Sequence, residues 1–159
     1  MVYTSGMLLE RYSSYSNQYN KIKRECQEGR LIKLKRGLYD DAPSLPAYLR
    51  SAYIYGPSYI SFEYALSSFG LIPEQAKNVT CASFRKNKMK RYDTKLGSFI
   101  YRDVPPVVFP LAVKHERKEG YVYLIARPEK ALCDELYTVK QVYSMRDLED
   151  LLFEDLRID

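Results

Sequence analysis

Several residue types are scarce in this sequence, and each scarcity excludes a class of site. The 159 residues include no tryptophan, one histidine and three cysteines. Cys26, Cys81 and Cys133 are odd in number and widely spaced, so they match neither a disulfide framework nor, together with His115, the spacing of a zinc site. We therefore expect free, mostly buried thiols, no metal and no cofactor.

Long apolar runs and targeting segments are also missing. No stretch approaches the ~18–20 apolar residues that cross a bilayer. The first residues, MVYTSGMLLERY, have neither the charged region nor the cleavage site of a signal peptide. The sequence therefore predicts a cytoplasmic protein without membrane contact.

Residues that could carry catalysis are few and poorly placed. His115 lies in a segment that reads as a charged turn, VKHERKEG, rather than in an apolar pocket. Glu129 and Asp134 are five residues apart on one predicted helix, so their carboxylates do not face each other. No glycine-rich phosphate loop is present. We expect a protein that is not an enzyme.

Positive charge, by contrast, is concentrated near the N-terminus. The formal net charge is +5, and residues 1–39 contain eight Lys and Arg against three acidic residues. The other 120 residues contain 17 charges of each sign, so the whole excess lies in the first quarter of the chain. Such asymmetry favours an N-terminal unit that faces a polyanion.

Two short helices are predicted in this basic region. The first covers residues 5–12, and the second lies within residues 13–28, where a preceding serine can cap it and Gly29 suits its end. The apolar side of the second helix is predicted to consist of Tyr15, Tyr19, Ile22 and Cys26. Its opposite face is polar and basic and consists of Asn17, Gln18, Asn20, Lys21, Arg24 and Gln27.

The next segment, GRLIKLKRGLYDD, alternates apolar and basic residues and predicts a β-hairpin. Ile32 and Leu34 are expected to point inward, while Lys33 and Lys35 point outward, and the chain turns at Gly37. A helix followed directly by a basic hairpin is typical of a winged helix-turn-helix, which binds DNA. The alternative is a solvated hairpin whose lysines only keep the protein soluble.

Beyond residue 41 the sequence predicts a mixed α/β unit. The segment DDAPSLPAYLRS reads as a linker, and Ser61 is expected to cap a helix that ends at Gly70. A further helix is expected to start at Pro128. Strands are predicted at residues 78–84, 97–104 and 120–126, and an acidic helix with a leucine stripe at residues 145–157.

A strongly basic segment, RKNKMKRYDTK, lies between the first two of these strands. It contains six basic residues and one aspartate and is predicted to be an exposed loop. The loop either is merely solvated, which we favour slightly, or contacts a partner. The candidate partner-binding residues are Arg85, Lys86, Lys88, Lys90 and Arg91.

Three segments together resemble the AbiEi family, the antitoxins of type IV toxin–antitoxin systems. IKRECQEGRLIKLKRGLY resembles the recognition helix and wing of that family. GPSYISFEYALSSFGLIPE and YLIARPEKALCDELY are similar to two further signatures, in the same order and at similar spacing. The resemblance spans about residues 5–140, and its strength lies in the three segments taken together.

The resemblance implies an α+β protein with two domains: a winged helix-turn-helix at residues 1–41 and an α/β antitoxin domain with a mixed sheet at residues 45–159. It implies a transcriptional autorepressor that binds inverted repeats in its own promoter. It also implies an antitoxin, active in abortive infection and phage defence, that counters a nucleotidyltransferase-like toxin, usually without a stable complex.

Mapped onto this chain, the resemblance places the recognition helix at residues 15–28 and the wing at residues 31–39. The expected DNA-binding residues are Asn17, Gln18, Lys21 and Arg24 on the helix and Lys33, Lys35 and Arg36 on the wing. Inverted repeats imply two copies per operator, either as a homodimer or by cooperative binding. The helix at residues 145–157 either joins two copies or packs on its own domain.

One departure from the family leaves a second reading open. Family members commonly begin with an additional helix, whereas only about a dozen residues precede Ser13 here. The missing support comes either from the C-terminal domain or from a second copy, or else DNA binding has been lost. In the last case the protein is a non-catalytic module that binds protein or RNA and has lost operator recognition.

Overall fold

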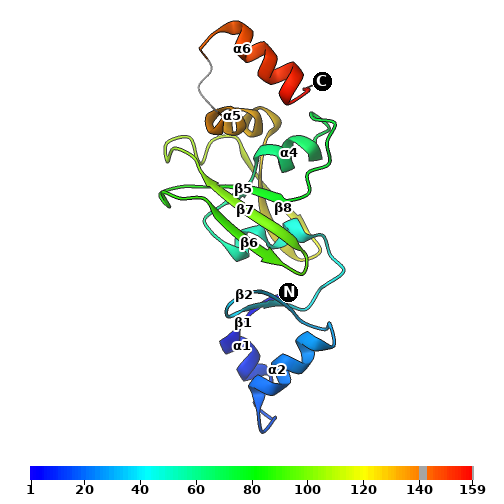
Figure 1. Cartoon of the computed structure of the whole chain (residues 1–159). Coiled ribbons are helices and arrows are strands. Elements are labelled where there is room, and N and C mark those ends of the chain that lie inside the picture. The colour runs from blue at the N-terminus through cyan, green and yellow to red at the C-terminus, as the bar shows by residue number, and fades with distance from the viewer. Residues whose placement is uncertain (140–142, 159) are drawn as a thin grey trace.

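The computed structural model describes residues 1–139 and 143–158 and shows a mixed α+β protein with two sheets (Figure 1). We refer to residues 1–41 as the N-terminal module and to residues 45–158 as the large domain. The N-terminal module lies at one end of the molecule, and the helices α5 (Pro128–Thr138) and α6 (Met145–Glu149) lie at the other. The expected fold class is confirmed.

The N-terminal module combines two helices with a three-stranded antiparallel sheet. Helices α1 (Ser5–Arg11) and α2 (Gln18–Gln27) precede a hairpin of β2 (Ile32–Lys35) and β3 (Leu38–Asp40). These elements agree with the sequence prediction. Strand β1 (Val2–Thr4), which was not predicted, pairs with β3 and gives the order β1-β3-β2.

The small sheet is buried on both of its faces. On one face Tyr3 and Tyr39 pack with Leu8 of α1 and Ile22 of α2. The opposite face contributes to the core of the large domain through Val2, Ile32, Leu34 and Leu38. The large domain therefore supplies support to a module that has only two helices.

The apolar face predicted for α2 is partly wrong. Ile22 is buried, but Tyr15 is 47% exposed and Tyr19 is 68% exposed. Glu25, rather than Tyr15 or Tyr19, is the second buried residue of this helix. Its burial is tolerated because Lys21 and Arg30 neutralise the carboxylate. The helix also begins later than predicted, with Asn17 rather than a serine as its cap.

The large domain is built on a six-stranded mixed sheet of order β6-β7-β5-β4-β9-β8. Helices α4 (Phe62–Ser68) and α5 pack together on one face, and η1 (Ala47–Arg50) and α3 (Ser51–Ile54) lie between the sheet and the N-terminal module (Figure 1). The strands are β4 (Tyr59–Ile60), β5 (Val79–Ser83), β6 (Lys90–Thr94), β7 (Gly97–Asp103), β8 (Val113–Lys118) and β9 (Tyr121–Ala126).

Two of these strands correct the sequence prediction. Strands β5, β7 and β9 lie where strands were expected, but residues 90–94 form the edge strand β6 rather than part of a loop. Residues 113–118, read as a charged turn, form the other edge strand, β8. Neither strand has a fully buried residue, which is compatible with the charged side chains that protect sheet edges.

The C-terminal segment consists of α6, which Ser144 caps, followed by the π-helical η2 (Asp150–Asp155). Its predicted leucine stripe is half-buried, and Ile158 packs against the core of the large domain. None of the helices in the described residues is long and apolar enough to cross a membrane.

Candidate nucleic-acid interface

Helix α2 presents one continuous polar and basic face to solvent. The side chain of Asn17 accepts a hydrogen bond from the Asn20 amide and starts the helix, and Gly29, with φ of +75°, ends it. Within the helix the exposed residues Tyr19, Asn20, Lys23, Arg24 and Gln27 recur at helical spacing, and the exposed C-cap residue Glu28 adds one acid at the end of this face.

The four helix residues predicted to bind DNA are not brought together on this face. Arg24 is exposed and lies 2.8 Å from Glu28, an exposed pair that solvent weakens. Asn17 is engaged as the N-cap, and Gln18 is half-buried. Lys21 lies on the flank of the helix, 2.6 Å from Glu25 and above the rings of Tyr12 and Tyr15.

Glu25 fixes the position of α2 against the start of the hairpin. Its carboxylate accepts hydrogen bonds from Arg30, with the Arg30 Nε at 2.6 Å, and forms an ion pair with Lys21. The hydrogen bonds from Arg30 and Lys21 lower the pKa of Glu25 to about 2. The group therefore stays ionised at neutral pH and pairs with both cations.

The three basic wing residues have different surroundings. Lys33 and Arg36 are exposed, and Gly37, with φ of +78°, makes the turn between the strands. Lys35 is not a free wing lysine: its Nζ donates a hydrogen bond to the carbonyl of Ile54 and lies 5.9 Å from the centre of the Tyr92 ring. Lys35 therefore ties the hairpin to the large domain and is not available to phosphate.

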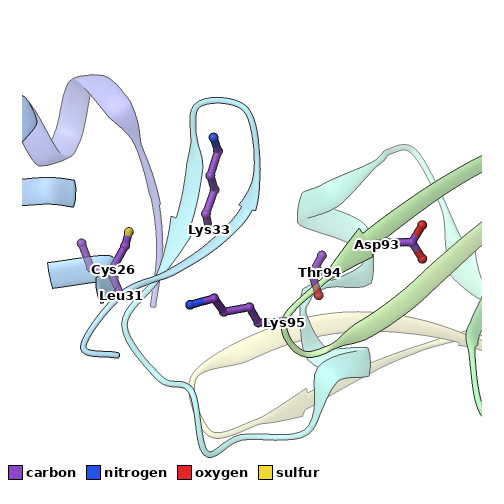
Figure 2. A pocket seen from close by; sticks show the side chains of 6 residues that line it. All are labelled: Cys26, Leu31, Lys33, Asp93, Thr94 and Lys95. Atoms are coloured by element: carbon purple, nitrogen blue, oxygen red, sulfur yellow. The ribbon is translucent and has the colours of Figure 1, made fainter. Parts of the chain in front are cut away.

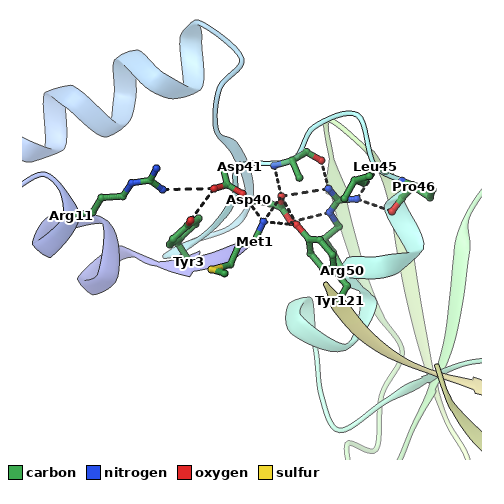
Figure 3. Close-up of polar contacts among 10 residues, drawn as sticks. Met1, Tyr3, Arg11, Asp40, Asp41, Leu45, Pro46, Arg50 and Tyr121 are labelled. Carbon is green, nitrogen blue, oxygen red and sulfur yellow. Dashed lines mark hydrogen bonds and ion pairs between the residues drawn. The ribbon is translucent and has the colours of Figure 1, made fainter. Parts of the chain in front are cut away.

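The predicted linker is in fact a buried joint between the two units (Figure 3). Asp40 and Arg50 are fully buried and form an ion pair of 3.0 Å. The hydroxyl of Tyr121 donates to the Asp40 carboxylate at 2.8 and 2.9 Å, and the guanidinium of Arg50 also donates to the carbonyls of Leu45 and Pro46 at 2.7 Å. Every charge in this joint is therefore hydrogen-bonded.

The residues of the basic segment 85–91 lie in and beside the β5–β6 connection and are partly engaged. The amides of Lys86 and Asn87 each donate to Asp103 at 2.6 Å, which orders the loop. Arg91 pairs with Asp93 at 2.9 Å. Arg85 and Lys88 are exposed, and Lys90 is half-buried.

A buried polar network joins the two signatures of the large domain. Asp134 of α5 accepts hydrogen bonds from Tyr59 at 2.8 Å, from Ser61 at 2.7 Å and from Lys130 at 2.7 Å. All four side chains are buried. The sequence could have revealed Lys130 and Asp134 as an i,i+4 pair, but not their partners about 70 residues away.

Ser61 is the N-cap residue of α4, as predicted, but its side chain makes no capping hydrogen bond. Its hydroxyl is used by Asp134, and Thr80 of β5 takes over the capping function, accepting from the Tyr64 amide at 3.0 Å. Phe62, the first residue of α4, has φ of +56°, which is strained for a residue with a side chain. The network with Asp134 and Thr80 holds this turn in place.

Beside the network lies a cluster of two carboxylates and one guanidinium. Arg102 donates to Glu63 at 2.6 Å and lies 3.5 Å from Glu135, whose Oε2 has no hydrogen-bond partner. Burial, and then the charge of Glu63, raise the pKa of Glu135 to about 7, although Arg102 opposes the shift. Glu135 is therefore expected to titrate near neutral pH.

No family model matches the chain, and no curated protein matches it.

Proposed function

We propose that this protein binds duplex DNA by placing the exposed face of α2 in the major groove. The observation that carries the proposal is the composition of that face, which offers Asn20, Lys23, Arg24 and Gln27 and has one exposed acid, Glu28, at its C-terminal end. Asparagine and glutamine pair with adenine, and arginine pairs with guanine, through the hydrogen-bonding edges of the major groove. Lys33 and Arg36 of the hairpin would contact phosphates without reading sequence.

The contacts that hold α2 in place support this role. A recognition helix must keep its position when its outer face contacts DNA, and α2 is held from behind by Ile22, Glu25 and the small sheet. The sheet in turn rests on the large domain. A helix of ten residues with this backing is long enough to lie across the groove.

The resemblance to the AbiEi family adds a cellular role to the proposal. The protein would repress its own promoter at inverted repeats and counter a nucleotidyltransferase-like toxin. The toxin part is tested by identifying the neighbouring gene: if it encodes a nucleotidyltransferase-like protein that stops growth, co-expression of this chain should restore growth, and failure to do so would reject the antitoxin role.

The first prediction concerns Arg24. Replacement of Arg24 by Ala should weaken binding to the protein's own promoter by about 1–3 kcal/mol, which is about fivefold to more than a hundredfold, if its guanidinium binds a guanine. Fluorescence anisotropy with the promoter duplex and a scrambled duplex measures affinity and specificity together. Arg117→Ala, on the edge strand β8, is the matched control and should bind as the unchanged protein does.

Two results would reject this assignment. Equal losses on the promoter and the scrambled duplex would make Arg24 a phosphate contact. Binding that does not change with salt would reject DNA altogether, since each phosphate contact contributes about −0.9 to the log–log slope. In that case RNA is rejected with DNA, and a module that binds protein becomes the better explanation.

A further inference from the structure

A groove of about 410 Å³ separates α2 and the hairpin from the large domain (Figure 2). Cys26, Leu31 and Lys33 line it from the N-terminal module, and Thr94 and Lys95 from the large domain. Lys95 occupies the turn between β6 and β7, and Figure 2 shows its side chain reaching toward the module. Each unit thus contributes one ammonium group to the same groove.

The groove carries net positive charge that the described residues do not neutralise. Neither Lys33 nor Lys95 forms an ion pair with a carboxylate in the part of the chain that the structure describes. The one acid on the lining, Asp93, is occupied by Arg91 and Ser98. Burial raises the pKa of the Cys26 thiol, and the charges of Lys95 and Lys33, which line the same groove, both oppose that shift.

The groove continues the exposed face of α2. Lys23 precedes Cys26 by three residues, so the two side chains are neighbours on the helix surface. Positive charge therefore runs from Arg24 and Lys23, past the half-buried Cys26, to Lys33 and then across to Lys95.

The two walls of the groove are held at a fixed separation. Strand β2 packs beside β6, and Lys35 binds the carbonyl of Ile54 across the boundary. The buried pair of Asp40 and Arg50 closes the same boundary nearby. Lys95 is therefore carried at a set position relative to α2, although it belongs to the other unit.

We propose that this groove binds the phosphate backbone of duplex DNA beside the base pairs that α2 contacts, with Lys95 as an anchor supplied by the large domain. The inference rests on the proposed function and adds a second contact region to it. Lysine is suited to this task because its ammonium group is a point charge that binds phosphate without reading bases. The large domain would thereby take a direct part in DNA binding.

The test is the salt dependence of binding by Lys95→Gln. One lost phosphate contact should reduce the log–log slope by about 0.9 and weaken binding about fivefold near 0.15 M salt, equally on promoter and scrambled duplexes. Lys118→Gln, at the end of the opposite edge strand β8, is the matched control and should leave both quantities unchanged. Circular dichroism of both variants checks that the fold is kept.

A second measurement does not depend on any lysine variant. In a Cys133→Ser background, DNA should slow alkylation of Cys26, because the duplex would cover the groove, while Cys81 is fully buried and inert. If the unchanged protein binds no DNA, the proposed function fails. If it binds and Lys95→Gln behaves as Lys118→Gln does, the groove proposal fails while the proposed function stands. If Lys95→Gln lost affinity for the promoter but not for the scrambled duplex, Lys95 would be contacting bases, and the groove proposal would also fail.

Discussion

Asp40 and Arg50 form a buried ion pair that joins the N-terminal module to the large domain. A buried ion pair is costly to desolvate and is retained where every charge finds partners. Here Tyr121 and the carbonyls of Leu45 and Pro46 complete the hydrogen bonding. Burial, followed by the hydrogen bond to Asp40, raises the pKa of the Tyr121 phenol, so it remains a donor at all ordinary pH values.

The prediction at this site concerns Tyr121→Phe and Asp40→Asn. Loss of the Tyr121 hydroxyl removes a hydrogen bond to a charged group and should lower the free energy of unfolding by about 1.5–3 kcal/mol. Asp40→Asn leaves Arg50 buried without a counter-charge and should cost more, about 3–5 kcal/mol. Urea unfolding measures both, with the exposed Tyr137→Phe as control. Losses below about 0.5 kcal/mol would show that water reaches the joint.

Glu135 gives a prediction about pH. Its folded-state pKa of about 7 exceeds the unfolded value of 4.5, so the folded chain holds the proton more tightly. Stability contributed by this group is therefore present below pH 4.5 and is lost as pH rises toward 7. Glu135→Gln should remove this loss, worth on the order of 3 kcal/mol, and gain stability relative to the unchanged protein between pH 5 and 8.

The measurement is the free energy of unfolding at several pH values. Glu154→Gln, an exposed acid in η2, is the control and should follow the unchanged protein. A Glu135→Gln variant whose stability runs parallel to that of the unchanged protein would mean that Arg102 keeps Glu135 ionised throughout this range.

At the scale of elements, the sequence predicts the strands that have a regular apolar pattern and misses the strands whose side chains are mostly polar and half-buried or exposed. The hairpin and strands β5, β7 and β9 have apolar residues at alternate or consecutive positions, and each was located correctly. Strands β6 and β8 were missed because edge strands have few buried side chains to reveal them. Strand β1 was missed because three residues carry too little pattern.

The buried side of α2 could be predicted only in part, for a different reason. Periodicity identifies which residues share a side of a helix, but it does not say which side is turned inward when tyrosines and charged residues alternate. Tyr19 was assigned inward and Glu25 was not, because a glutamate is buried only where partners neutralise it. Those partners, Lys21 and Arg30, lie in the same segment, but their geometry comes only with the fold.

At the scale of the whole molecule, the prediction concerns stoichiometry. Two-fold inverted repeats are bound by two-fold pairs, so we expect two chains per operator. Sedimentation with duplexes that carry one or both half-sites measures this. The leucine stripe near Leu148 is half-buried within one chain, so a protein ending at residue 143 tests its role. A folded truncated protein with an unchanged number of chains on DNA would exclude the stripe from pairing.

The burial of the small sheet on both faces has a consequence for modularity. A DNA-binding unit with a complete core of its own can be excised, transplanted or exchanged by recombination. Here a fragment that ends at residue 41 would expose Ile32, Leu34 and Leu38 to solvent. It would also leave Asp40 without its partner Arg50. A functional chimera would therefore have to carry residues 1–55 together with a surface that replaces the large sheet, which makes this unit poorly portable between proteins.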